Sequence, residues 1–308
     1  MTFLSVLFAL ILEHYVSWHR RDRLLAPYLR WTAWLRRVLD SGTARHGILA
    51  LVLALLPVLA LGVLLHFGPL LLGGVALAWL VDLLVLGAVI DFKTLSDRLG
   101  QIGSLLRSEH WPQAAAAIED WEGGALPGEF DGAGLASRAI QLALLHAHWR
   151  VLVPILWFVL LPGACGPLLY SATLTVQRQW LAAGADGGEF GRPAAILLGW
   201  LDWLPARLTA LSFAVVGNFE ESLFCWRNQT HQTPADDARV VLAAGAGAIG
   251  VHFEPAPVLP YGVINGDLGT GDFPGAEHLQ NAEGLLARTL VLSVVLLGLL
   301  TLGGLVSI

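Results

Sequence analysis

Long runs of apolar residues dominate the hydrophobic pattern of the chain. Such a run predicts a membrane-spanning helix when it reaches about 20 residues, because a helix bonds its own backbone where no water is present. The runs that approach or exceed this length are Ile48–Leu65, Leu70–Ile90, Val151–Leu174, Ala194–Val216 and Thr289–Ile308. We expect Pro154, Pro162 and Pro167 to kink the third run. The pattern predicts an all-α polytopic membrane protein, organised as a single domain over residues 1–308.

A shorter apolar run, Phe3–Leu12, opens the chain. No basic residues precede it and no small-residue cleavage pattern follows, so we interpret it as an uncleaved helix that spans or lies on the membrane. If it crosses, six crossings place the arginine-rich stretches 19–46, 91–150 and 218–288 on one side. Basic connections stay in the cytoplasm, so we expect these stretches inside, both termini outside, and a bacterial inner-membrane location.

The cytoplasmic connections are expected to be helical. Helix-period spacing covers Phe92–Leu106 and Leu135–Arg150, and Pro112 marks the start of a second helix near His110–Trp121. The spacing of Trp31–Leu39 predicts an amphipathic basic helix. We expect it to bind anionic lipid headgroups or, alternatively, a partner protein.

The insertion over residues 218–288 contains two distinctive stretches. Ala243–Gly250 consists of small residues and Ile, which predicts close helix packing. Glu254–Pro274 is rich in Pro and Gly and is expected to form an ordered loop or lid. Within it, Gly266–Asp272 is glycine-rich but lacks the spacing of a phosphate-binding loop.

Composition supports the membrane assignment and removes other classes. Hydrophobic residues make up 56% and charged residues only 14% of the chain, with a mean hydropathy of +0.65. Soluble domains carry about 25% charged residues. The formal net charge of −6 provides no basic field, so we expect no nucleic-acid partner. The two cysteines exclude a disulfide scaffold and a four-cysteine zinc site.

The segment Asp202–Arg207 places an acid and a base inside an apolar run. Charges at membrane depth are costly and usually face a cavity or a partner. Asp202 can cap a helix that begins at Trp203, with Pro205 in its first turn, which would divide the run into two pieces. Arg207 can bind phosphate or carboxylate through its planar fork. A structural ion pair is the alternative for both charges.

Asn218, Glu220 and Glu221 follow the same run. The two carboxylates could hold a Mg²⁺ ion carried by nucleotide phosphates. They could equally mark a solvated helix end, since adjacent helical side chains point about 100° apart. The predicted substrate or phosphate site consists of Asp202, Arg207, Asn218, Glu220 and Glu221, facing the cytoplasm.

Three other polar residues lie in or near membrane segments. Asp82 is in the middle of a run, where it could pair with Arg207 or a polar neighbour, or serve a proton or substrate route. His146 and His148 are two residues apart, which is poor spacing for two metal ligands on one helix. The sequence therefore predicts no metal site.

Two segments resemble the CobD/CbiB membrane family of cobalamin biosynthesis. Asp202–Ala210, with its Pro-Ala-Arg-Leu-Thr core, is similar to a family signature, and Ala243–Val251 is similar to a later Ala-Gly-rich segment. The resemblance implies an adenosylcobinamide-phosphate synthase, an ATP- and Mg²⁺-dependent ligase that joins adenosylcobyric acid to an aminopropanol phosphate. Its ligand would be phosphorylated or corrinoid-like.

The chain departs from that family where the family carries acidic or polar motifs. The corresponding stretches here are Trp121–Gly124, Leu142–Arg150 and Ser171–Thr175. Ligase activity, ATP and Mg²⁺ therefore stay open as expectations. The alternative is a non-catalytic signalling modulator or sensor, because AmpE-like membrane proteins share a similar Trp-x-Pro-x-Arg-Leu segment and lack those motifs. A homo-oligomer or a membrane partner is compatible with either function.

Overall fold

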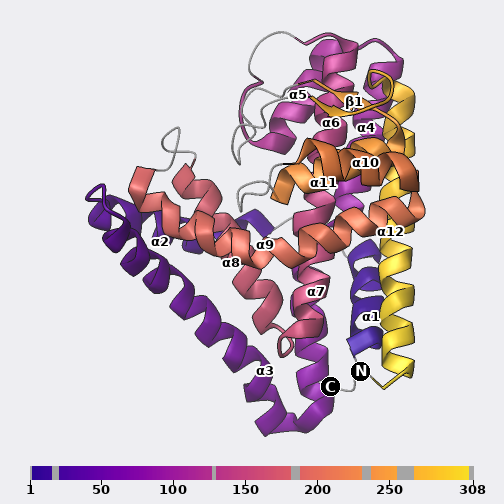
Figure 1. Ribbon diagram of the computed structural model, residues 1–308. Coiled ribbons are helices and arrows are strands. Elements are labelled where there is room, and N and C mark those ends of the chain that lie inside the picture. The colour runs from indigo at the N-terminus through magenta and orange to yellow at the C-terminus, as the bar shows by residue number, and fades with distance from the viewer. Residues whose placement is uncertain are drawn as a thin grey trace. The chain divides into compact units, whose positions relative to one another are not determined.

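The computed structural model is almost entirely helical (Figure 1). It describes residues 2–15, 21–126, 130–181, 188–230, 237–254 and 267–304. The helices are α1 (Thr2–Tyr15), α2 (Arg21–Leu39), α3 (Ala44–Val89), α4 (Phe92–Arg107), α5 (Trp111–Glu122), α6 (Gly132–Ala147), the π-helix His148–Leu152, α7 (Val153–Leu160), α8 (Cys165–Leu181), α9 (Gly188–Val216), α10 (Phe219–Gln229), α11 (Asp237–Ile249) and α12 (Ala276–Leu302). Two short strands, β1 (His252–Phe253) and β2 (Leu268–Gly269), pair antiparallel. Most of the predicted loop 254–274 lies outside the described residues.

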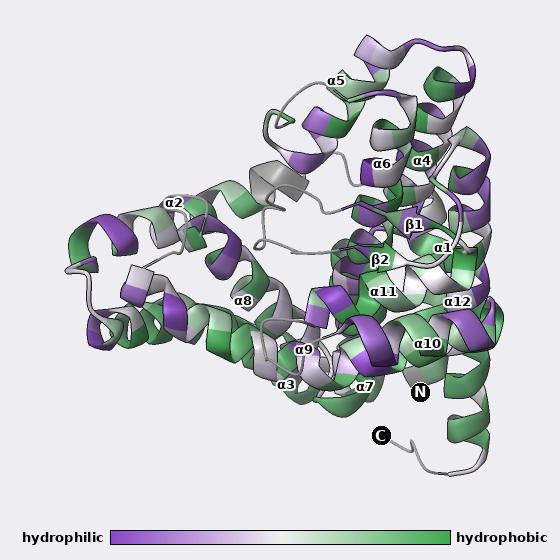
Figure 2. Cartoon of the chain, turned by 45° about the horizontal axis from the view of Figure 1, so that its top comes forward, coloured by the Kyte–Doolittle hydropathy of each residue, from purple (hydrophilic) through white to green (hydrophobic). Residues whose placement is uncertain are grey.

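The chain folds into two compact units. The first unit contains residues 1–91, 150–202 and 296–308, and the second contains residues 92–149 and 203–295. Four helical stretches are long and apolar enough to cross a membrane, namely Ala44–Arg107, Gly132–Leu160, Gly188–Val216 and Ala276–Leu302. Figure 2 shows the hydrophobic colouring along α3 and the C-terminal half of α12. The predicted all-α polytopic membrane protein is confirmed.

Helix α3 is two helical arms joined at Gly74. The backbone there has φ 72° and ψ −167°, a conformation that an L side chain rarely adopts. The predicted runs Ile48–Leu65 and Leu70–Ile90 correspond to the arms, but the bend falls inside the second run rather than between the two. A β-carbon at Gly74 would meet no atom within 4 Å, so backbone conformation alone explains the glycine.

The predicted run Val151–Leu174 is not one kinked helix. α7 ends at Leu160, a turn follows, and α8 begins at Cys165. Pro162 cannot continue the helix, and Gly163 takes a positive φ of 46° that allows the chain to reverse. The turn lies against both arms of α3, because Ala164 bonds to Asp82 while Gly62 abuts Cys165.

Helix α9 is continuous through Asp202, so the predicted break and helix cap at this residue are wrong. Pro205 has no N–H, which would leave the carbonyl of Leu201 four residues earlier without its helical donor. The indole Nε1 of Trp157 donates to that carbonyl at 3.3 Å. A side chain from α7 thus replaces the missing backbone donor, and the proline stays within the helix.

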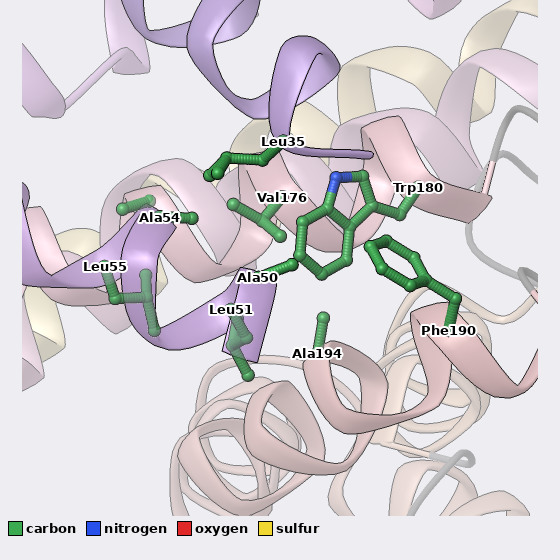
Figure 3. Close-up of a cluster of buried hydrophobic side chains, with 10 residues drawn as sticks. Leu35, Ala50, Leu51, Ala54, Leu55, Val176, Trp180, Phe190 and Ala194 are labelled. Atoms are coloured by element: carbon green, nitrogen blue, oxygen red, sulfur yellow. The ribbon is translucent and has the colours of Figure 1, made fainter. Parts of the chain in front are cut away.

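A core of buried side chains in the first unit joins α2, the first arm of α3, α8 and the start of α9 (Figure 3). The rings of Trp180 and Phe190 pack with centroids 4.8 Å apart. Arg36 donates to the carbonyl of Trp180 at 2.7 Å and so caps the end of α8. The predicted amphipathic helix thus directs Leu35 inward, while Trp31 and Trp34 stack on each other at the surface.

The second unit confirms the predicted close packing of Ala243–Gly250. A β-carbon on Gly247 would lie 2.5 Å from the backbone oxygen of Glu221, and one on Gly245 would lie 2.7 Å from Leu144. Ser222 also donates to the carbonyl of Ala244 at 2.9 Å. Small residues therefore bring α10 and α6 against α11, which positions the charged residues described next.

Candidate functional site

Asp202 is buried in the first unit, where it accepts a hydrogen bond from the phenol of Tyr170 at 2.7 Å. Both side chains are almost fully buried, with exposed fractions of 5% and 0%. Two further charges, those of Arg150 and Arg178, act electrostatically on the same phenol. Asp202 therefore belongs to a polar cluster between α8 and α9.

Arg207 lies in the second unit and forms an ion pair with Asp237 at the start of α11. Its Nη1 donates to Asp237 at 2.8 Å and to the carbonyl of Trp203 at 2.6 Å. The guanidinium carbon also lies 4.5 Å from the centre of the Trp203 ring. Asp237 is 6% exposed, whereas Arg207 is 31% exposed. The acid is thus enclosed while the base keeps one side open.

Asn218, Glu220 and Glu221 form the beginning of α10. The side chain of Asn218 accepts from the backbone N–H of Glu221 at 3.2 Å and so caps the helix. Glu221 accepts from the hydroxyl of Thr270 at 2.5 Å. Glu220 is exposed and makes no hydrogen bond or ion pair within the described ranges. The two carboxylates have different surroundings, which matches a helix N-terminus better than a shared ion.

The glycine-rich segment around Thr270 is held against α10. The side-chain amide of Gln229 donates to the carbonyl of Gly269 at 3.0 Å and accepts from its N–H at 2.8 Å. Cys225 is fully buried beside Thr270. Burial raises the pKa of the Cys225 thiol, and the charge of Glu221 also raises it. The segment is an ordered part of the second unit.

Both carboxylate oxygens of Asp82 have partners within the first unit. Its Oδ2 lies 2.7 Å from Nδ1 of His66, and its Oδ1 accepts from the N–H of Ala164 at 2.9 Å. The polar neighbour that the sequence predicted is therefore confirmed as His66, from the other arm of α3.

His146 and His148 have separate partners. Trp121 donates to Nδ1 of His146 at 3.3 Å, and Nδ1 of His148 lies 2.9 Å from the hydroxyl of Thr209. No group of three or more His, Cys, Asp or Glu side chains able to hold a metal occurs in the portion of the chain that the structure describes.

Sequence reasoning missed Tyr170, Asp237 and Thr270, the partners of three predicted site residues. Asp237 had a usable signal, since an acid directly before an apolar helical stretch is typical of a first helical turn. Tyr170 and Thr270 had none, because each belongs to a segment far along the chain from its partner.

These features define a polytopic helical membrane protein. Its second unit carries a partly exposed arginine, Arg207, and a glycine-rich segment around Thr270 that is bonded to α10. The chain belongs to the CobD/CbiB family, since the family described as CobD/Cbib protein matches residues 6–285.

Curated relatives agree with this assignment. The chain is 29% identical to "Cobalamin biosynthesis protein CobD" of Stutzerimonas stutzeri (strain A1501) over 293 residues, which cover 92% of this chain and 93% of the relative. It is 37% identical over 123 residues to a protein of the same name from Chromobacterium violaceum, covering 40% of this chain and 39% of that one. A protein of that name from Brucella suis biovar 1 is 26% identical over 181 residues, covering 56% and 54%. No solved structure matches the chain.

Proposed function

We propose that this protein acts in cobalamin biosynthesis in the bacterial inner membrane, where Arg207 binds a phosphorylated, corrinoid-like ligand. The proposal rests on one observation: only one of the three guanidinium nitrogens of Arg207 is used within the described residues of the protein. Nη1 is occupied by Asp237 and Trp203, while Nε and Nη2 make no hydrogen bond in the part of the chain described here. Those two nitrogens form the edge of the fork that binds two oxygens of a phosphate side by side.

The surroundings of Arg207 hold that edge in place. The ion pair fixes one end of the guanidinium, and the Trp203 ring supports its face. A guanidinium held in this way loses less conformational freedom when it binds an anion. The names of the curated relatives supply the pathway, and Arg207 supplies the phosphate chemistry.

The described residues contain no preassembled Mg²⁺ site made of protein side chains alone. Glu221 is bound to Thr270, Glu220 is exposed, and no third acidic or histidine side chain joins them within the described ranges. A Mg²⁺ ion carried by nucleotide phosphates needs only one or two protein carboxylates, so this arrangement assigns no particular residue to the ion. We therefore derive no ligase step, and the proposal rests on ligand binding alone.

The binding proposal is tested on purified protein in nanodiscs. Dissociation constants for an aminoalkyl phosphate and for its dephosphorylated alcohol are measured with wild type, Arg207→Met and Arg192→Met. Arg192 is a matched control, because it lies on the same helix and is 64% exposed in an ion pair with Glu189. We expect Arg207→Met to weaken phosphate binding about tenfold or more, since a charged hydrogen bond contributes about 1.5–3 kcal/mol.

The control variant should keep wild-type affinity, and the alcohol should bind equally weakly to all three proteins. Equal phosphate affinity of the wild type and folded Arg207→Met would overturn the proposal. A strain lacking the gene and supplied with each variant then reports on the pathway, through growth that depends on corrinoid synthesis.

A second candidate is a non-catalytic membrane sensor. The observation that favours it is the packing of Leu142–Arg150, where related enzymes carry acidic residues. Leu142, Leu144 and Leu145 are buried in α6, and Leu144 fills the space beside Gly245. If corrinoid synthesis is unaffected by loss of the gene while an envelope-stress phenotype appears, this candidate replaces the first.

A further inference from the structure

A cavity of about 320 Å³ lies in the first unit, beside the bend of α3. Its lining comes from α1, from both arms of α3, and from the end of α7 with the turn that follows. Most of these side chains are apolar, including Ala78, Trp79 and Phe158. The exceptions include Ser5, His66 and Asp82. A mostly apolar cavity with a few polar groups is the usual form of a small-molecule site.

The polar pair, His66 and Asp82, lies on the two arms of α3, one residue on each side of the bend at Gly74. His66 lies eight residues before Gly74 and Asp82 eight residues after it, so each is about 12 Å along its arm from the bend. Gly163 completes the arrangement, because a β-carbon there would collide with Asp82 and with Nδ1 of His66. Backbone, imidazole and carboxylate thus meet at one wall of the cavity.

The pair leaves one ring atom available. Nδ1 of His66 bonds to Asp82, whose other oxygen is occupied by the N–H of Ala164. Nε2 of His66 has no hydrogen-bond partner in the described portion of the chain, and the side chain is 21% exposed. A carboxylate fixes the orientation of a histidine ring so that the opposite nitrogen is presented to a ligand.

We propose that this cavity binds a neutral, lipid-soluble alcohol or phenol, with its hydroxyl on Nε2 of His66 and its apolar body against Trp79 and Phe158. A hydroxyl both donates and accepts hydrogen bonds, so it matches Nε2 whether or not that nitrogen carries a proton. The apolar lining favours a neutral body over a charged one, since a charge would lose its hydration. Helices α3 and α7, which supply most of the cavity lining, belong to candidate membrane spans, so such a molecule would enter from the lipid.

The test uses the full-length protein in nanodiscs and an alkylphenol that carries a diazirine. After irradiation, we expect mass spectrometry to find the label on residues 75–82 and 158–163. Two competitors of nearly the same shape, 4-propylphenol and propylbenzene, differ only in the hydroxyl. The phenol should compete at least about threefold better, which corresponds to one net hydrogen bond.

Two substitutions separate the cavity from the lipid-facing surface. Ala78→Leu fills the cavity and leaves both members of the polar pair unsubstituted, and Ala76→Leu makes the same change at an exposed position of the same arm. Labelling should fall at least fivefold in the first and stay at the wild-type level in the second. His66→Phe should keep apolar binding but abolish the preference for the phenol.

Unchanged labelling in folded Ala78→Leu, or equal competition by the two compounds in wild type, would overturn the proposal. Both results are obtained without His66→Phe, so the test holds even if that variant does not fold. The two experiments use different variants and different ligands, so either proposal can fail while the other stands.

Discussion

At the scale of single residues, several polar side chains bind backbone groups that helices leave unpaired. Asp82 binds the N–H of Ala164, Trp157 binds the carbonyl of Leu201, and Arg36 binds the carbonyl of Trp180. A bare backbone group in an apolar environment costs several kcal/mol, so these side chains make turns and a proline tolerable there. These three contacts are structural, whatever else the side chains do.

The role of Trp157 leads to a double-mutant prediction. Trp157→Phe leaves the Leu201 carbonyl without a donor and should lower the free energy of unfolding by about 1–3 kcal/mol. In a Pro205→Ala background, the alanine N–H can reach that carbonyl, so the same substitution should cost clearly less. Denaturant unfolding of the four proteins in detergent measures the coupling, and equal costs in both backgrounds would refute this role.

The buried bond between Tyr170 and Asp202 gives a second prediction. Tyr170→Phe removes only the hydroxyl and leaves a buried carboxylate with one donor fewer, which should destabilise the protein by about 1–3 kcal/mol. Tyr28→Phe is a suitable control, because the Tyr28 hydroxyl is buried without a hydrogen-bond partner in the described structure. That control should have little effect or a slight stabilising one when thermal unfolding is compared.

The sequence indicated charged residues at this scale but not their partners. Asp202 and Arg207 stood out because charges are rare in apolar runs, whereas Tyr170 and Asp237 are reached only after the chain folds. The predicted cap at Asp202 failed for the same reason, since its supporting observation, Pro205, is compensated by a tryptophan 48 positions earlier. The sequence pattern around Pro205 contains no sign of a hydrogen-bond donor that another helix supplies.

At the scale of elements, apolar length predicted the membrane helices well and their ends less well. The run Val151–Leu174 contains a chain reversal that its hydropathy conceals, because the residues of the turn are themselves apolar. Pro162 and Gly163 were the visible signals. The bend of α3 depends on a single positive φ at Gly74, and neighbouring glycines made that position impossible to single out.

Close packing of α10 on α11 predicts a sharp difference between two glycines. Gly247→Ala would place a β-carbon 2.5 Å from the Glu221 carbonyl oxygen, so the helices must separate, at a cost of about 1–3 kcal/mol or more. Gly284→Ala meets no atom within 4 Å and lies inside α12, so it should stabilise the protein by about 0.5–1 kcal/mol. Melting temperatures that shift in the same direction would contradict this packing.

Burial of Cys225 within α10 predicts slow thiol chemistry. Burial raises the pKa of this thiol, so less of the reactive thiolate is present at neutral pH, and the side chain is fully covered. Maleimide should leave Cys225 unmodified in the folded protein and modify it fully after denaturation, as peptide mass spectrometry would show. Rapid modification of the native protein would mean that the β2 segment does not stay on α10.

At the scale of the whole molecule, the two units are each assembled from separated segments. The first unit draws on three stretches of the chain and the second on two. Hydropathy could not predict this division, because α9, α12 and the helix Gly132–Leu160 each continue from one unit into the other. The prediction of a single domain and the six-crossing topology stay predictions.

The apolar helices lead to a prediction about the intact protein. Large apolar side chains such as Leu71, Leu72 and Leu302 are 86%, 88% and 87% exposed, which is costly in water but favourable against lipid chains. We expect the protein to remain in the membrane pellet after washing at alkaline pH and to be released only by detergent. Release by the alkaline wash would show that it does not span the bilayer.

The spacing of His66 and Asp82 about Gly74 limits how this part of the gene can vary. Inserting or deleting one residue in either arm would turn the side chain by about 100° and withdraw it from its counterpart. Single substitutions on the lipid-facing side leave the spacing of His66 and Asp82 unchanged. We expect the segment from 66 to 82 to tolerate many exchanges of one apolar residue for another, yet almost no change of length.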